Sequence, residues 1–327
     1  MRPMKKLDPA NQLLLSKLAD GRFHSGEELG EILSLSRASI SKRMAELRRL
    51  GLDIFSVKGK GYRLAHPLSL LDEERLKASL GEHLALWSEV GSTNDVLKAE
   101  KAPPNGAVVL AECQTAGRGR RGQNWVSPFG AHLYFSLFWQ MDSRHAALQG
   151  LSLVAGVAVA NAINATLGDA VRLKWPNDIY HNGRKLGGIL VELVGQANGP
   201  VNIIIGVGLN VAMPLDAARQ VDQPWTDLQQ IYNRLVDRTE LANQVISRLR
   251  DALATFSEKG LAAFVDDWNR LDCFWGQAVV LKNEQSQQVG ICRGIESDGA
   301  LLLEAGGQVS RIYGGELSMR SHDGITG

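Results

Sequence analysis

Apolar residues in the first fifty positions recur every three or four residues, the spacing that gathers them on one face of a helix. We predict helices around 14–18, over 25–33 and over 37–50. Ser25-Gly26-Glu27-Glu28 matches a capping box that starts the second helix, and Ser36 can cap the third. Only a short turn then separates the last two helices.

The third helix has an apolar back and a basic, hydroxyl-rich front, and two short strands follow it at 54–57 and 62–64. The turn between the strands, Lys58-Gly59-Lys60-Gly61, suits a hairpin and places lysines to touch phosphate. This order of elements is typical of a winged helix-turn-helix, with a small helical interaction module as the alternative. We predict a DNA-binding domain over 1–66, with contacts from Ser36, Arg37, Ser39, Lys42, Arg43, Lys58 and Lys60.

Beyond residue 83, short apolar strands alternate with helices. A linker helix is expected over 68–80 and a buried helix over 146–167, and Asn182-Gly183 is a strong hairpin signal beside Lys185. The predicted strands cover 85–90, 107–114, 132–139, 171–175, 188–194 and 201–208. This pattern predicts an α+β fold, a mixed sheet with helices on one face.

The last part of the chain changes pattern again. Helices are expected over 241–256 and 261–271, and four alternating strands with glycine turns follow them. These strands, at 278–282, 289–295, 300–304 and 309–313, predict a small β-barrel. We therefore divide the chain into a winged-helix domain (1–66), a central mixed-sheet domain (67–271) and a small β-barrel domain (272–327).

The charge of the chain is unevenly distributed. The whole sequence has 36 Lys+Arg and 35 Asp+Glu, but residues 1–66 hold 13 basic and 7 acidic side chains, which leaves 23 and 28 for the remainder. A basic N-terminal segment on an acidic body favours a polyanionic partner for the first domain. A solvated basic face is equally compatible with the charge alone.

Cysteine usage and hydrophobicity indicate a cytoplasmic protein without membrane association. Cys113, Cys273 and Cys292 lie far apart without a C-x-x-C pair, which argues against a disulfide framework or a structural zinc site. The most apolar stretch, 146–160, contains Gln149 and is shorter than the roughly 20 residues of a membrane span.

A segment rich in glycine and arginine, residues 115–125, is called here the arginine loop. Gly117–Gly122 satisfies G-x-G-x-x-G, but the residues after it do not begin a helix, so we reject a dinucleotide-binding loop. Ordering seven loop residues costs roughly 7–14 kcal/mol of backbone entropy, and the three arginines repel one another. We expect the loop to be loose when empty and to close over an anion such as a nucleotide phosphate.

Four sequence blocks resemble the signature sequences of biotin protein ligases, in the expected order and at the expected distances. They are Glu89-x-x-Ser92-Thr93-Asn94, Gln114-Thr115-Ala116-Gly117-Arg118-Gly119-Arg120, Lys174-Trp175-Pro176-Asn177-Asp178 and Arg184-Lys185-Leu186-Gly187-Gly188-Ile189-Leu190. Together with the winged helix, nearly the whole chain resembles the bifunctional ligases that also repress the biotin operon.

The resemblance implies a two-step reaction. ATP first converts biotin into biotinyl-5′-adenylate and pyrophosphate, and a lysine of the biotin carboxyl carrier protein of acetyl-CoA carboxylase then takes the biotin. Biotin would be bound by Ser92, Thr93, Asn94, Gln114, Arg118, Gly119, Arg120 and Lys185. ATP and the adenylate would be bound by Arg120, Arg121, Trp125, Asn177 and Asn210, with Trp125 stacked on adenine.

Joining two anions requires fixed cations, because a phosphoryl transition state gathers negative charge on oxygen. We therefore predict that Lys185 bridges the carboxylate and the phosphate, and that Arg118 and Arg120 complete the catalytic charge. Asp178 is either a ligand of the Mg²⁺ that accompanies ATP or a turn cap, and the sequence does not favour one over the other.

The fusion of the two activities suggests a switch. Our hypothesis is that the adenylate orders the arginine loop, which completes a homodimer face, so that two wings reach two operator half-sites. Three other functions stay open: a biotin-sensing transcription factor without ligase activity, a lipoate-type ligase with the same fold, and a ligase that does not bind operator DNA.

Overall fold

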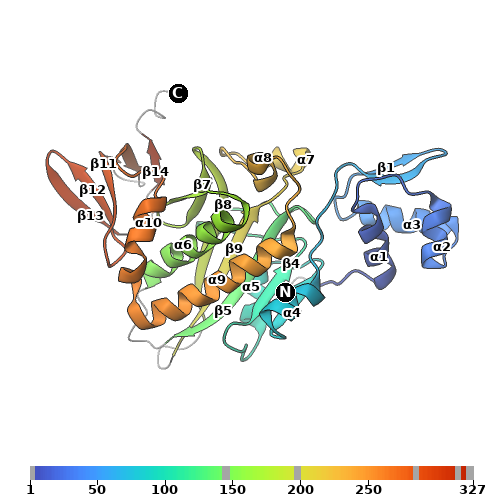
Figure 1. Cartoon of the computed structure of the whole chain (residues 1–327), viewed down its shortest axis with the longest axis horizontal. Helices are drawn as coiled ribbons and strands as arrows, with labels where there is room; N and C mark the ends of the chain where they lie inside the picture. The colour runs from blue at the N-terminus through green and yellow to red at the C-terminus, as the bar shows by residue number, and fades with distance from the viewer. Residues whose placement is uncertain (1–3, 142–147, 195–199, 283–286, 314–317, 322–327) are drawn as a thin grey trace.

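The computed structural model describes residues 4–141, 148–194, 200–282, 287–313 and 318–321. Three units follow one another along its longest axis (Figure 1). A small helical unit with a β-hairpin lies at one end, a large sheet with helices forms the middle, and a small sheet lies at the other end.

The first unit contains α1 (Pro9–Leu18), α2 (Gly26–Leu33), α3 (Arg37–Arg48), β1 (Ile54–Val57) and β2 (Gly61–Leu64). Both expected caps form: Ser25 Oγ accepts the N–H of Glu28 at 3.0 Å, and Ser36 Oγ accepts that of Ser39 at 3.2 Å. The helices close over a core of Leu14, Leu15, Leu18, Leu29, Ile40, Met44 and Leu47. The winged helix-turn-helix predicted from the sequence is confirmed.

The middle unit is built on a seven-stranded sheet in the order β3-β4-β5-β9-β8-β7-β6. Only β3 and β4 pair in parallel, and all the other pairs are antiparallel, so the sheet is mixed as predicted. Its strands are β3 (Leu84–Trp87), β4 (Val108–Ala111), β5 (His132–Met141), β6 (Arg172–Lys174), β7 (Asp178–His181), β8 (Arg184–Val194) and β9 (Val201–Asn210).

Helices cover both faces of this sheet, so the expectation of helices on one face was wrong. α6 (Leu148–Leu167) and α9 (Arg238–Lys259) pack side by side on one face, and α5 (Thr93–Ala99) packs on the other (Figure 1). The two faces alternate along β9, where Ile203 and Ile205 join the large core and Ile204 joins the cluster under α5. A strand that is apolar on both faces is typical of a sheet covered on both sides, so the sequence of β9 carried a signal that the prediction did not use.

The helix α6 is long and apolar enough to cross a membrane by length and composition, over Gly150–Leu167. This window extends beyond the apolar stretch 146–160 on which the sequence argument was based. However, 67% of the window is buried inside the protein, and the helix packs along α9. It is the buried core helix that was predicted; residues 146–147 of that prediction lie outside the described residues.

The connection between the first two units is extended, and α4 (Glu73–Leu80) begins five residues later than the predicted linker helix. Asp72 caps α4 by accepting the N–H groups of Glu74 and Arg75. The backbone before this cap is bound to the middle unit instead: the N–H of Leu71 donates to Glu112 and that of Asp72 to Thr239.

Further helices lie between the two sheets in sequence: α7 (Leu215–Ala218), α8 (Leu228–Tyr232), the short 3₁₀ helix η3 (Leu261–Phe264) and α10 (Val265–Leu271). The last unit is a five-stranded antiparallel sheet in the order β13-β12-β11-β10-β14. A small β-barrel was predicted here. Among the described residues the sheet is open, with β13 and β14 as its edge strands, and these two strands do not pair to close a barrel. Its strands are β10 (Ala278–Lys282), β11 (Gln287–Ile295), β12 (Leu301–Ala305), β13 (Gln308–Ile312) and the unpredicted β14 (Ser318–Ser321).

Candidate active site

A cavity of about 320 Å³ lies over β8 and β9, between the arginine loop and the segment 213–225. Every residue predicted to bind biotin or ATP lines it, although these residues come from positions as far apart as 92 and 210. They are Ser92, Thr93, Asn94, Gln114, Arg118, Gly119, Arg120, Arg121, Trp125, Asn177, Asp178, Lys185 and Asn210. The structure thus brings the whole predicted set together; their individual roles stay predictions.

One end of the cavity is a network of buried neutral polar groups. Gln114 Oε1 accepts the N–H of Thr93 at 2.9 Å and its hydroxyl at 3.2 Å. Ser136, a fully buried residue of β5, donates to Thr93 Oγ1 and also contacts Asn94 Oδ1. Such a network can present fixed donors and acceptors to a neutral polar ring. Sequence reasoning missed Ser136, although a serine within an apolar strand is a signal of a buried polar site.

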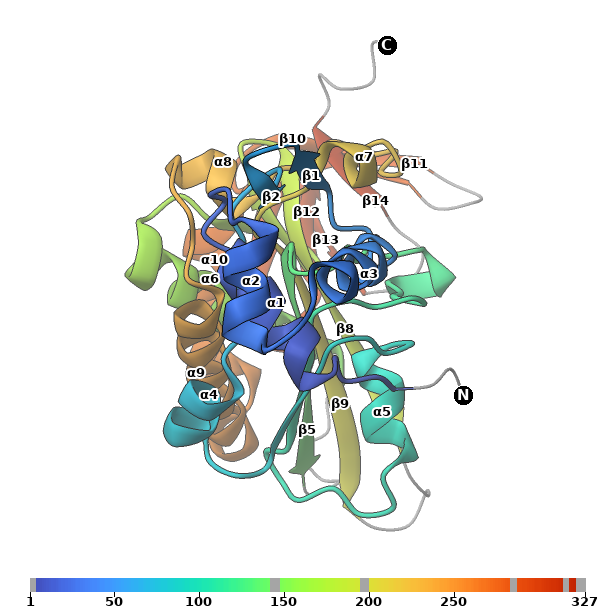
Figure 2. The same ribbon diagram turned by 90° about the vertical axis from the view of Figure 1, so that its right-hand side faces the viewer.

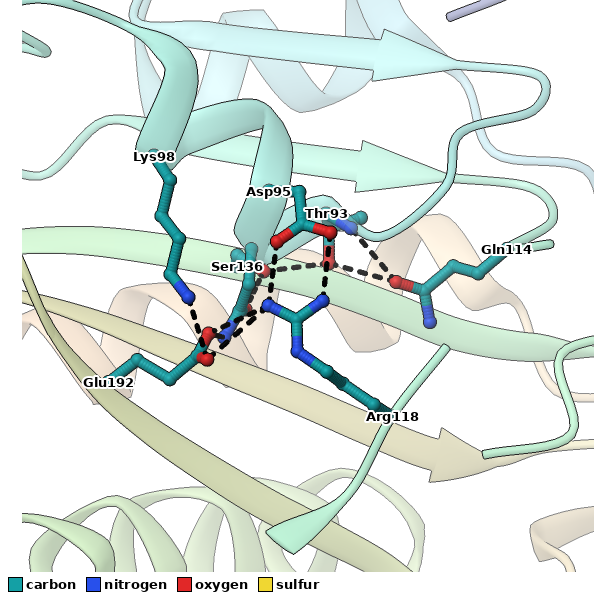
Figure 3. A network of polar contacts seen from close by, with 8 residues as sticks. Thr93, Asp95, Lys98, Gln114, Arg118, Ser136 and Glu192 are labelled. Carbon is teal, nitrogen blue, oxygen red and sulfur yellow. Dashed lines mark hydrogen bonds and ion pairs between the residues drawn. The ribbon is translucent and has the colours of Figure 1, made fainter. Parts of the chain in front are cut away.

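Arg118 is bound by two carboxylates (Figure 3). Its guanidinium makes two hydrogen bonds to Asp95, at 2.8 and 2.7 Å, and lies 3.2 Å from Glu192. The hydrogen bond to Asp95 raises the pKa of Arg118, against desolvation and with the help of Glu192. Arg118 therefore anchors the arginine loop to α5 and β8, and its charge is already balanced in this structure.

Three members of this ionic network were not found from the sequence: Asp95, Lys98 and Glu192. Lys98 lies 2.7 Å from Glu192, which also accepts a hydrogen bond from Asn94 (Figure 3). Glu192 is separated from Arg118 by 74 residues. The local signal, a polar residue within an otherwise apolar strand, indicates an inward-facing charge but not its partner.

Lys185 lies at the start of β8, where the Asn182-Gly183 turn places it. Both turn residues have positive φ, 46° and 74°, as the two-residue hairpin requires. Lys185 Nζ is 2.7 Å from Asp178 Oδ1, and both side chains are only 17% exposed. The backbone of Lys185 is also fixed by hydrogen bonds to Pro224 and Thr226. The lysine is thus a rigidly held cation at the cavity wall.

Arg120 is a second cation of the cavity, and its surroundings lower its pKa. Desolvation, and then the neighbouring Arg121, lower the pKa of Arg120, and Asp178 offsets this only in part. Its Nη1 donates to Asn177 Oδ1 at 3.3 Å. An anion bound at this place would relieve the cost of keeping the guanidinium charged.

Two glycines, Gly188 and Gly208, lie against the indole ring of Trp125. A Cβ added at Gly208 would lie 2.6 Å from the indole Cε2 of Trp125, whereas one at Gly188 would lie 3.6 Å from its Cζ3. Trp125 therefore packs directly on the backbone of β9, with Lys185 Nζ 5.8 Å from its ring centre. Its indole N–H is buried and has no partner among the described residues.

Gly208→Ala is expected to displace the Trp125 ring from the cavity. Overpacking of this kind costs about 1–3 kcal/mol, which predicts a fall in kcat/KM for ATP of about fivefold to a hundredfold. Steady-state kinetics measure the loss. In a Trp125→Ala background the same substitution should cost little, because the ring that it meets is gone. An equal loss in both backgrounds would show that contact with the ring is not the cause.

The residues predicted to contact DNA lie on the front of α3 and in the turn of the hairpin. Ser36, Arg37 and Lys42 are exposed at the start of α3, Ser39 is half-buried there, and Lys58 and Lys60 are exposed between β1 and β2. Arg37 pairs with Glu27 at 2.6 Å, and both side chains are largely exposed. Arg43 differs: it is bound to Asp8 and Asn11 and does not stand free.

The donor set around Asp178 fits a magnesium ion only in part. No group of three His, Cys, Asp or Glu side chains suited to a metal occurs within the described ranges. The Oδ1 atom of Asp178 is already paired with Lys185. Since Mg²⁺ is commonly held by one or two carboxylates and by substrate phosphates, the site fits an ion that ATP brings with it and not one held by the protein alone.

Comparison with known proteins agrees with this geometry. The model of the biotin/lipoate A/B protein ligase family matches residues 88–210, an HTH domain model matches 11–63, and a biotin protein ligase C-terminal domain model matches 274–320. The bifunctional ligase/repressor BirA of Salmonella typhimurium strain LT2 is 45% identical over 94% of this chain and 97% of its own length. BirA of Escherichia coli strain K12 is also 45% identical, over 94% and 96%.

The chain belongs to the family of bifunctional biotin ligase/repressors. The resemblance seen in the four sequence blocks is thereby confirmed. A solved biotin protein ligase of Aquifex aeolicus in complex with biotin and ATP has a TM-score of 0.64 and 30% identity. The match covers 73% of this chain and 98% of the Aquifex chain.

Proposed function

We propose that this ligase/repressor activates biotin with ATP to biotinyl-5′-adenylate, in the cytoplasm, and transfers it to a lysine of the biotin carboxyl carrier protein. The observation that carries the proposal is the single cavity that gathers Lys185, Arg120 and the neutral network of Thr93 and Gln114. The neutral network suits the ureido ring of biotin, and the cations suit a carboxylate and a phosphate.

In the first step, a biotin carboxylate oxygen attacks the α-phosphorus of ATP, and the bond to the pyrophosphate oxygen breaks. Lys185 would bind both anions and stabilise the charge that gathers on the phosphoryl oxygens, and Arg120 would hold the phosphate from the other wall. When bound, Mg²⁺ would neutralise phosphate charge, with Asp178 as its protein ligand. Arg118 would act indirectly, by holding the arginine loop closed so that water does not hydrolyse the mixed anhydride.

In the second step, the acceptor lysine amine attacks the biotinyl carbonyl, and AMP leaves. The decisive experiment is to incubate the full chain with biotin, MgATP and a carrier domain, and to weigh the carrier by mass spectrometry. A mass increase that corresponds to one biotinyl group supports the ligase. A carrier of unchanged mass would leave the alternative of a biotin sensor without catalysis.

The lipoate-type alternative requires its own control. Isothermal titration with biotin and with lipoate, each with ATP, separates the two substrates. We expect binding of biotin alone, because the ring of biotin offers the donors and acceptors that Thr93, Asn94 and Gln114 can match. Preferential lipoate binding would contradict the assignment.

We also propose that the adenylate-bound protein dimerises and represses the operon of biotin synthesis. The exposed front of α3 and the lysines of the wing support DNA binding, and a dimer would present two such surfaces to two half-sites. Sedimentation with and without biotin and ATP tests the switch, and self-association without ligand would contradict it. A gel-shift assay on the upstream region of biotin synthesis genes tests operator binding.

A further inference from the structure

The N-terminal arm, residues 4–8, joins the first unit to the middle sheet at a place separate from the linker (Figure 2). Lys5 pairs with the chain after β3: its N–H donates to Glu89 at 2.9 Å, and its carbonyl accepts the N–H of Ser88 at 3.0 Å. The N–H of Leu7 donates to Ser88 Oγ at 2.8 Å, and Lys5 Nζ lies 2.9 Å from the Glu89 carboxylate. These contacts hold the backbone of the arm against Ser88 and Glu89 as far as Leu7, the residue before Asp8.

Asp8 serves two purposes at once. Its carboxylate caps α1 by accepting the N–H groups of Ala10 and Asn11, at 3.0 and 3.1 Å. The same carboxylate binds Arg43 of α3, whose Nη1 lies 2.8 and 3.0 Å from its two oxygens. Desolvation acts to raise the pKa of Asp8, but the amides and Arg43 outweigh it and lower the pKa below its usual value. Asp8 is thus firmly held in its charged form.

Arg43 is bound more completely than the other cations of the DNA-facing surface. Its Nη1 also donates to Asn11 Oδ1 at 2.8 Å, and its side chain is only 24% exposed. By contrast, the Arg37 side chain is 74% exposed, so a phosphate can approach it while its pair with Glu27 persists. A phosphate that bound the Nη1 atom of Arg43 would therefore compete with the Asp8 carboxylate, which already holds this atom.

We propose that the arm is an autoinhibitory latch, in which Asp8 holds Arg43 away from DNA and a DNA phosphate must displace it. The inference rests on the DNA-binding function proposed above. A phosphate contact carries no base information, so the latch lowers affinity for any duplex. It weakens non-specific binding as well as operator binding.

The substitution Asp8→Asn tests the latch. Asparagine is as good an N-cap as aspartate, so α1 should keep its start while the charge on Arg43 is released. Glu31→Gln is the matched control, because Glu31 is an exposed residue of α2 and its loss changes the net charge of the same unit equally. The full-length variants are titrated against a duplex of fixed mixed sequence by fluorescence anisotropy at low salt, and ligase activity reports that the fold is intact.

Asp8→Asn should bind the duplex about threefold to tenfold more tightly than Glu31→Gln does. The gain should shrink as salt is added, and it should vanish when Arg43→Gln is combined with Asp8→Asn. Equal affinities of the Asp8 and Glu31 variants would overturn the latch, and so would a gain that survives without Arg43. If the unaltered chain binds neither this duplex nor the operator region, the DNA-binding function itself fails and the latch fails with it.

Discussion

Replacing Lys185 with alanine is expected to slow adenylate formation by about 10²- to 10³-fold, the usual effect of removing one preorganised charge donor. The expectation follows from the position of Lys185: it is mostly buried, its backbone is bonded to the 224–226 segment, and its ammonium faces the cavity. Release of pyrophosphate from ATP in the presence of biotin measures the effect.

Arg184→Ala is the matched control for this experiment. Arg184 is the residue before Lys185 in the same hairpin, but it is exposed and does not line the cavity. Its loss should leave the rate within about twofold, since an exposed charge in water interacts only weakly with the site. Comparable losses in the two variants would mean that the net charge of the hairpin matters and not the ammonium in the cavity.

The parts of the fold that were predicted correctly depend on local signals. Ser25, Ser36 and the Asn182-Gly183 pair each fix the backbone within a few residues, and all three form the caps or turns expected of them. The set of cavity residues was predicted from the resemblance of the sequence blocks to biotin protein ligases, and the structure brings these residues to one cavity.

The parts that were missed depend on partners far along the chain. Arg118 binds Glu192, which lies 74 residues away in the sequence. Lys5 and Glu89, which form another ion pair, are 84 residues apart. A sequence shows that such a residue is charged, but not which opposite charge the fold will bring to it. Arg118 is an example, because its two carboxylate partners, Asp95 and Glu192, were not predicted.

Arg238 is the clearest case of a long-range contact, and its loss should have the largest effect on stability. The side chain is 1% exposed at the start of α9 and lies 2.6 Å from Glu112 Oε2. It also donates to the carbonyl oxygens of His132 and Ser69. Glu112 in turn accepts the N–H of Leu71 at 2.7 Å. One guanidinium thereby joins the linker, the end of β4 and the start of β5.

Arg238→Ala should lower the free energy of unfolding by about 3–5 kcal/mol, because it leaves the Glu112 carboxylate buried without its counter-charge. Urea denaturation measures the change. Arg270→Ala is the control, since Arg270 is 58% exposed and its pair with Asp267 should contribute less than about 1 kcal/mol.

A second variant separates the buried charge from the lost packing. If the unpaired carboxylate is the main cost, Arg238→Met combined with Glu112→Leu should be more stable than Arg238→Met alone, because no charge is then left buried. If the double variant is the less stable of the two, Glu112 stabilises the fold through contacts other than Arg238, such as the N–H of Leu71. Gln114 lies two residues beyond Glu112, so loosening the end of β4 should also raise KM for biotin, which steady-state kinetics of the same variants measure.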